Sequence, residues 1–155
     1  MESIRQSRSR FDASGNLYVA NCPSCYAKQG TGSVAEYAPG AGVPSRVLRD
    51  GIDNPDALVS GKDGLLVVAN NPSLSYSITK PGWISVYSST GKSPQHRITR
   101  GTKSVDSLAI DADGYVYAES YGKHSDVVVV ARDGSRVIRT ITDGVVLPNR
   151  IAVGY

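Results

Sequence analysis

The chain has 155 residues, of which 40% are hydrophobic and 20% charged, and a net charge of +3, a composition typical of a globular protein. Its longest apolar runs, at 65–69 and 127–131, are far shorter than the roughly 20 residues of a membrane span, so we interpret them as buried strands. Basic residues are interspersed with Asp and Glu instead of forming a stripe, which argues against nucleic-acid binding.

Residues 1–10 are polar and basic, with Arg5, Arg8 and Arg10 set against Glu2. No apolar stretch follows them, so they lack the core of a secretory signal peptide. We therefore expect a polar amino-terminal tail. The segment 8–11 is too polar for the innermost strand of a repeat.

A segment of about ten residues occurs three times, at 11–21, 61–70 and 110–119. Its turn glycines, Gly15, Gly64 and Gly114, are spaced by 49 and 50 residues. Self-similarity at a fixed period is typical of a tandem repeat architecture. We expect units at about 11–58, 59–108 and 109–155.

Each complete unit contains four short segments with the alternation of strands, a period too short for an amphipathic helix. The first strand ends a glycine-led segment at 51–58, 101–108 or 144–151. An Asp/Ser/Gly turn, including 111–114, then leads into the second strand, because glycine supplies the positive φ of a bulged hairpin. The predicted second strands are 17–21, 65–70 and 115–119, the third 33–37, 83–87 and 126–130, and the fourth 46–49, 96–100 and 137–142.

Four antiparallel strands in about fifty residues are typical of a β-propeller blade. The predicted class is therefore all-β, with about three four-stranded blades in an incomplete ring. The first unit lacks a good inner strand, whereas 151–153 would be an orphan inner strand with no blade behind it. The strand inventory is three, four, four and one.

The fourth strands are basic, as expected of exposed edges that must not pair with a neighbouring chain. We interpret their arginines as solvated outer-edge residues. They are Arg46, Arg49, Arg97, Arg100, Arg136 and Arg139.

The segments Asp-Ala-Ser-Gly-Asn-Leu-Tyr-Val-Ala-Asn at 12–21, Val-Ala-Glu-Tyr-Ala-Pro-Gly at 34–40 and Pro-Asp-Ala-Leu at 55–58 resemble NHL-type propeller repeats. These are related in fold to gluconolactonase- and regucalcin-like propellers. The likeness covers 11–155 and implies a ring of about six blades. It also implies a family that is often exported and that includes scaffolds, binding modules and some enzymes.

About three blades are half of such a ring. Either the chain is part of a longer propeller, or two chains complete one ring, with the orphan strand of one finishing the first blade of the other. In both cases exposed terminal blades favour self-association, because terminal repeats normally carry polar caps and none is evident here.

Cys22 and Cys25 form a Cys-x-x-Cys motif in the loop after the second strand of the first unit. A redox pair requires a βαβ context and a zinc site requires further ligands, but His96 and His124 show no ligand spacing. We favour a loop disulfide and keep free thiols as the alternative. A ring this short would contribute about 2 kcal/mol.

Equivalent positions ahead of the inner strands hold Asp56, Asp106 and Asn149, which a propeller places at one mouth of its channel. Resemblance to lactonase propellers implies a divalent cation such as calcium there, whereas capping of a Pro-containing turn is the structural alternative. The loops after the second strands open on the same mouth and carry aromatic candidates for ligand contact: Tyr26, Tyr76, Trp83 and Tyr121. Trp83 has the alternative of packing between blades.

No nucleophilic triad is indicated, since the two histidines have no serine elbow motif near them. We therefore expect a non-enzymatic binding module that uses its mouth loops to hold a protein or glycan, without a required cofactor. The alternative is a metal-dependent lactonase-type hydrolase.

Overall fold

The computed structural model describes residues 9–23, 32–72, 80–122, 125–148 and 150–153. These residues form twelve strands and no helix. Accordingly, the described part of the chain contains no helix long and apolar enough to span a membrane. The predicted all-β class is confirmed.

The strands form three four-stranded antiparallel sheets, each ordered as in the sequence. The first sheet contains β1 (Ser9–Phe11), β2 (Leu17–Asn21), β3 (Ser33–Tyr37) and β4 (Arg46–Leu48). The second contains β5 (Pro55–Ser60), β6 (Leu66–Asn70), β7 (Trp83–Tyr87) and β8 (His96–Ile98). The third contains β9 (Leu108–Ile110), β10 (Val116–Ser120), β11 (Asp126–Val130) and β12 (Val137–Ile141).

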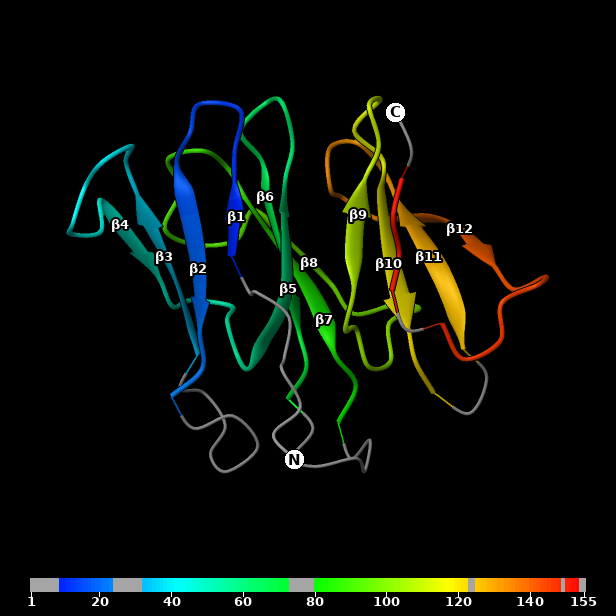
Figure 1. Ribbon diagram of the computed structural model, residues 1–155. Coiled ribbons are helices and arrows are strands. Elements are labelled where there is room, and N and C mark those ends of the chain that lie inside the picture. The colour runs from blue at the N-terminus through cyan, green and yellow to red at the C-terminus, as the bar shows by residue number, and fades with distance from the viewer. Residues whose placement is uncertain (1–8, 24–31, 73–79, 123–124, 149, 154–155) are drawn as a thin grey trace, which may run out of the picture.

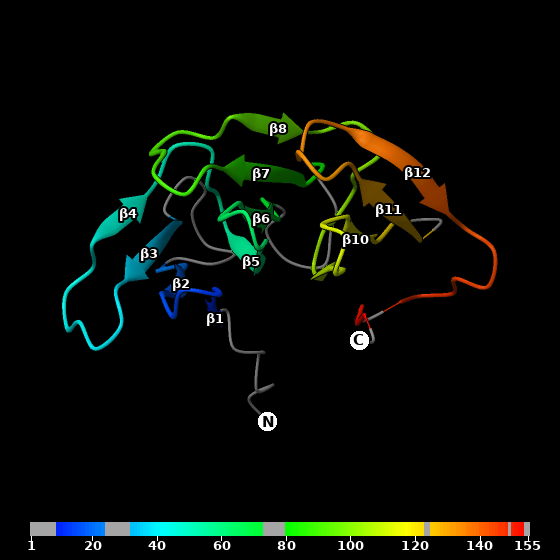
Figure 2. The same ribbon diagram turned by 90° about the horizontal axis from the view of Figure 1, so that it is seen from above.

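The three sheets stand side by side like blades (Figure 1). Seen from above, they fan out in an arc, with β4, β8 and β12 on its outside and one side left open (Figure 2). The inner strand β5 contacts both β1 and β9. The predicted arrangement of about three blades in an incomplete ring is therefore confirmed.

The hairpin between the first two strands of a sheet is closed by an aspartate and a glycine. Asp12 accepts hydrogen bonds from the backbone N–H groups of Ser14 and Asn16, each at 2.9 Å. Asp111 does the same in the third sheet, and Gly114 has a φ of 90°. The segment 111–114 is thus the hairpin turn that the repeat predicts.

Successive side chains of a strand lie on opposite faces of its sheet. Both faces of the second sheet are covered by a neighbouring sheet, so apolar residues occur on both. The face that looks toward the preceding sheet is called here the preceding face, and the opposite one the following face. The first and second sheets enclose one buried cluster: Tyr18, Val34, Leu48, Ile52, Leu58, Leu66, Val68 and Tyr87. The second and third enclose another: Val59, Val67, Ala69, Ile84, Val86, Ile98, Val105, Leu108, Val116, Ala118, Val128 and Val130.

The polar segment ahead of Phe11 nevertheless forms a strand. Residues 9–11 pair with β2 in the register Ser9 to Val19 and Phe11 to Leu17. The expected count of three strands in the first unit is therefore wrong. A strand ladder uses backbone groups, and all three β1 residues are exposed, so no apolar side chain is needed there.

Arg46 also departs from expectation, since it was predicted to be a solvated residue of the outer edge. Its side chain is buried, bonds Glu36 Oε2 at 2.6 Å and donates to the carbonyls of Ser88 and Gly91 at 3.1 and 2.8 Å. It thereby joins the first sheet to the second and is not a solvated edge residue. The expectation failed because the sequence does not show that a neighbouring sheet reaches this strand.

The segment after β12 has nearly the same positive φ values as the segment that leads from the first sheet into the second. Gly144 and Leu147 have φ values of 74° and 47°, and the equivalent Gly51 and Asn54 have 72° and 46°. Residues 150–153 form no ladder with a described strand, but the Ile151 N–H donates to Ser107 Oγ at 3.1 Å. The chain here therefore lies beside the start of β9, the inner strand of the third sheet.

Candidate functional site

The strands β2, β6 and β10 end at the same edge of the arc, the lower one in Figure 1. A row of polar residues runs along this edge from the first sheet to the third. We call it the mouth row, and its members are Cys22, Asn54, Asn71, Ser104, Asp106 and Glu119.

Short contacts connect the row. Cys22 Sγ lies 3.2 Å from Asn54 Oδ1, and the backbone N–H of Asn71 donates to the Asn54 carbonyl at 3.1 Å. Asn71 Nδ2 donates to Ser104 Oγ at 2.6 Å and to Asp106 Oδ1 at 2.8 Å. The Ser104 hydroxyl donates to the same carboxylate oxygen at 3.0 Å. Asn71 therefore bridges the second sheet to the chain that enters the third.

Glu119 is the carboxyl at the far end of the row, and only 2% of its surface is exposed. Burial, and then the negative charge of Asp106, raise the pKa of Glu119 to about 7. This carboxyl therefore exchanges a proton near neutral pH. It can donate a hydrogen bond when protonated and accept one when ionised.

Three buried polar atoms of the row have no hydrogen-bond partner among the described residues. They are Asn54 Nδ2, Asn71 Oδ1 and Glu119 Oε2. A buried polar atom without a partner costs about 1–3 kcal/mol. The row thus holds one unsatisfied amide donor, one unsatisfied amide acceptor and one carboxyl oxygen.

Two of the three predicted channel-mouth residues are described. Asp106 belongs to the mouth row, whereas Asp56 lies half-buried in β5. Asn149, Tyr26 and Tyr76 fall outside the described residues.

The two described aromatic candidates differ. Trp83 is 8% exposed, and its indole N–H donates to the Gly51 carbonyl at 3.0 Å, next to the interface of the first two sheets. Arg97 stacks on the same ring at 4.0 Å from its centroid. This placement fits the packing alternative. Tyr121, at 41% exposure, lies beside Ser104 through two backbone hydrogen bonds and is open to a ligand.

The predicted disulfide joins a described residue to an undescribed one. Cys22 follows β2 at the mouth, and Cys25 lies outside the described residues. The Cys22–Cys25 disulfide therefore stays a prediction.

Sequence reasoning missed four members of the row: Asn54, Asn71, Ser104 and Glu119. One signal pointed to Glu119, because counting from the turn glycine places it where the other two repeats have Ala20 and Ala69. A carboxyl in place of a small apolar residue is an unexplained departure from the repeat. Asn54 and Asn71 gave no such signal, since Asn is common in turns.

The row was also compared with the needs of a divalent cation. Among the described residues, no group of three or more His, Cys, Asp or Glu side chains is arranged to hold a metal ion. Asp106 already accepts two hydrogen bonds from its neighbours. The described residues therefore do not fit the cation site that the resemblance implies.

Comparison with protein-family models gave no match to this chain, and comparison with curated proteins gave none either.

Proposed function

We propose that this chain is a non-enzymatic binding module of the propeller type that holds an extended peptide segment of a protein partner at the mouth row. The observation that carries the proposal is the set of three buried, unsatisfied polar atoms on Asn54, Asn71 and Glu119. The resemblance to NHL-type repeats supports the same class, because that family includes binding modules.

The chemistry of the row suits a peptide backbone. Each peptide unit offers one N–H donor and one carbonyl acceptor, which complement Asn71 Oδ1 and Asn54 Nδ2. These atoms are buried, so a ligand must displace the residues that cover them. It then gains hydrogen bonds that the protein alone leaves unmade.

The second proposal is a lactonase-type hydrolase, which the resemblance and the carboxyl of Glu119 support. A carboxyl with a pKa near 7 suits general acid–base chemistry, and Glu119 has one. No metal-dependent step is derived, since the described residues do not bring together a set of metal ligands.

The test is an NMR titration of the ¹⁵N-labelled chain with a pool of capped tetrapeptides. The expected result is a saturable shift of the side-chain amide signals of Asn54 and Asn71. Asn71→Ala should weaken binding about tenfold, because it removes the acceptor and releases Asp106. Asn16→Ala, in a hairpin turn at the opposite edge, is the matched control and should leave the affinity for the peptides unchanged.

Shifts produced only by a parallel set of neutral oligosaccharides would replace the peptide with a glycan. Hydrolysis of a sugar lactone that depends on added calcium or zinc and is lost in Glu119→Gln would favour the enzyme. Shifts confined to the hairpin-turn edge, or no shift with either set, would contradict a mouth ligand.

A further inference from the structure

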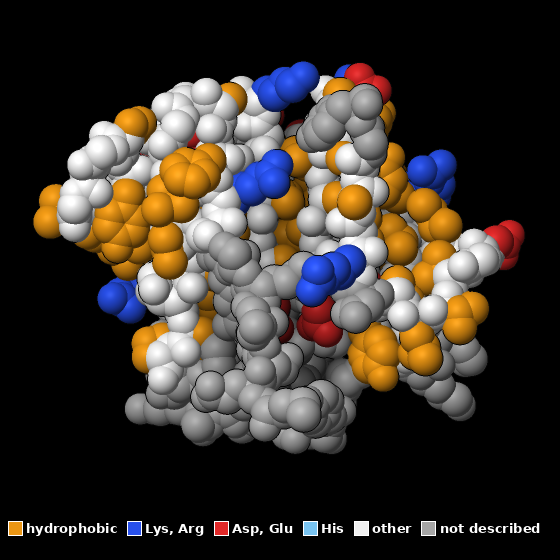
Figure 3. Space-filling model, in the orientation of Figure 1, with side chains coloured by type: hydrophobic (Ala, Val, Ile, Leu, Met, Phe, Trp, Pro, Cys, Tyr) orange, Lys and Arg blue, Asp and Glu red, His pale blue; other side chains and the backbone are white. Residues whose placement is uncertain are grey.

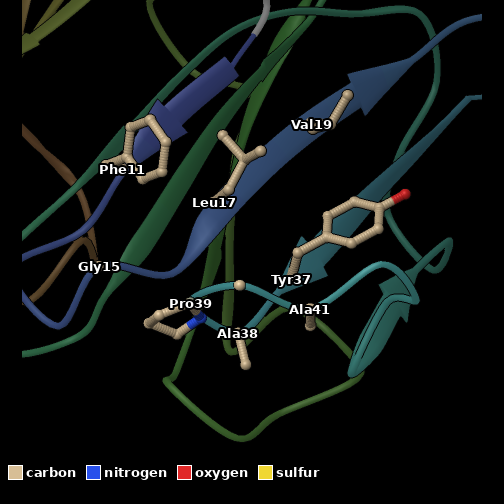
Figure 4. A pocket seen from close by; sticks show the side chains of 9 residues that line it. Phe11, Gly15, Leu17, Val19, Tyr37, Ala38, Pro39 and Ala41 are labelled. Atoms are coloured by element: carbon tan, nitrogen blue, oxygen red, sulfur yellow. The ribbon is translucent and has the colours of Figure 1, made fainter.

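The preceding face of the first sheet is apolar, and no strand among the described residues packs on it. Phe11, Leu17, Val19 and Tyr37 lie on one side of the sheet around a cavity of about 430 Å³ that the turn 38–41 completes (Figure 4). Phe11 is 65% exposed. Hydrophobic side chains gather over this sheet, and others over the third sheet, on the open side of the arc (Figure 3).

This face repeats a face that is covered elsewhere. The register of β2 with β3 pairs Leu17 with Tyr37, as that of β6 with β7 pairs Leu66 with Tyr87. Val19 likewise corresponds to Val68. In the second sheet this Leu, Val and Tyr are buried against the first sheet.

The following face of the third sheet repeats the surface that does the covering. In the first sheet that surface includes Tyr18, Val34 and Leu48. Counting from the turn glycines and the strand registers places Tyr117, Val127 and Ile141 at the equivalent positions. Tyr18 and Tyr117 also each donate a hydrogen bond to the turn aspartate of their own sheet. Tyr18 bonds Asp12 at 3.2 Å, and Tyr117 bonds Asp111 at 3.1 Å.

We propose that the third sheet of one copy docks on the first sheet of a second copy, in the register in which the first sheet packs on the second. Two such contacts close two copies into a ring. The ring has six blades, within the range of four to eight seen in propellers. This inference concerns the terminal faces and does not rest on the proposed mouth ligand.

Part of the polar contact is repeated as well, although Val129 stands where the first sheet has Glu36, the partner of Arg46. Arg139 occupies the position of Arg46, and the turn residues Ala38 and Ala41 occupy those of Ser88 and Gly91. Docking brings the Arg139 guanidinium to the carbonyls of Ala38 and Ala41, as Arg46 bonds Ser88 and Gly91.

A tyrosine hydroxyl completes the match. Tyr87 donates to the Asp50 carbonyl at 2.5 Å, just before Gly51. The equivalent pair across two copies is Tyr37 and the carbonyl of Asp143, just before Gly144. Since 144–147 already holds the conformation of 51–54, this acceptor is preformed.

The first experiment measures the mass of the full chain by light scattering over a range of concentrations. The expected species is a dimer. Val19→Arg puts a charge into the docked face and should raise the dissociation constant about a hundredfold or more. Val43→Arg is the matched control, since Val43 is 74% exposed and its counterpart Ser93 stays exposed beside a formed interface.

The second experiment separates this docking from pairing of two first sheets. Arg139→Glu, at an exposed site, faces the partner's carbonyls with a carboxylate and should also weaken the dimer. Mixing Val19→Arg with Arg139→Glu should give a heterodimer held by one of the two contacts, because the intact third sheet of the first variant fits the intact first sheet of the second. Circular dichroism spectra establish that each variant is folded.

Three outcomes overturn the inference. They are a monomer at every concentration, an open series of larger oligomers, and a dimer that Arg139→Glu leaves unchanged. None of these bears on the mouth ligand, whose binding is read from the Asn54 and Asn71 amide signals.

Discussion

The covered and the uncovered preceding faces carry the same Leu, Val and Tyr. In the second sheet Leu66, Val68 and Tyr87 are buried against the first sheet, whereas Leu17 and Val19 of the first sheet border an open cavity. The difference is one of neighbour and not of residue type. Equivalent substitutions in the two sheets should therefore change the free energy of unfolding by different amounts, and the difference measures the packing that the neighbouring sheet contributes.

The largest expected difference is between Leu66→Ala and Leu17→Ala. Leu66 is fully buried, so its truncation should lower the free energy of unfolding by about 3–5 kcal/mol. Leu17→Ala should lower it by about 1 kcal/mol or less at low protein concentration, where copies are apart. Urea denaturation measures both. If the two variants lose equal stability in the dilute chain, the first sheet is covered by something within the same copy.

Next in size is the contrast between the two equivalent arginines. Arg46→Ala breaks a shielded ion pair and two bonds to the second sheet, so it should lower the free energy of unfolding by about 2–3 kcal/mol. Arg139→Ala should change that of the dilute chain by less than about 0.5 kcal/mol. A large loss of unfolding free energy with Arg139→Ala in dilute solution would show that Arg139 already has bonding partners within its own copy.

The smallest expected effect concerns Glu119, which departs from the alanines of the other two repeats. Because its pKa is raised from the usual 4.5 to about 7, the folded chain holds this proton more tightly than the unfolded chain does. The stability that Glu119 contributes is therefore fully present below about pH 4.5 and is lost as the pH rises to 7.

Glu119→Gln keeps the hydrogen-bonding shape of the protonated acid and removes this dependence. The variant should match the parent at about pH 4 and exceed it by about 1–2 kcal/mol at about pH 8 in guanidinium denaturation. Asp63→Asn, in an exposed turn, is the control. A Gln variant that is no more stable than the parent at pH 8 would place Glu119 in contact with water.

Much of the fold could be predicted because the repeat shows it three times. The turn at 111–114 followed from its match to 12–15, and the strands from alternation between recurring glycines. The candidate site was less accessible. Asp106 was identified from its position ahead of an inner strand, but Asn71 reaches it from a different sheet across 35 positions of the chain. No local pattern encodes that contact.

The sequence by itself determined the hairpin turns, every strand but β1 and the face on which each strand side chain lies, since a strand's period of two depends only on the chain. The tertiary structure decided what covers each face. It buried Arg46 between two sheets, used Trp83 for packing, closed Glu119 off from water and left Leu17 and Val19 open. The reason is that alternation assigns a side chain to a face, whereas burial depends on which distant segment packs against it.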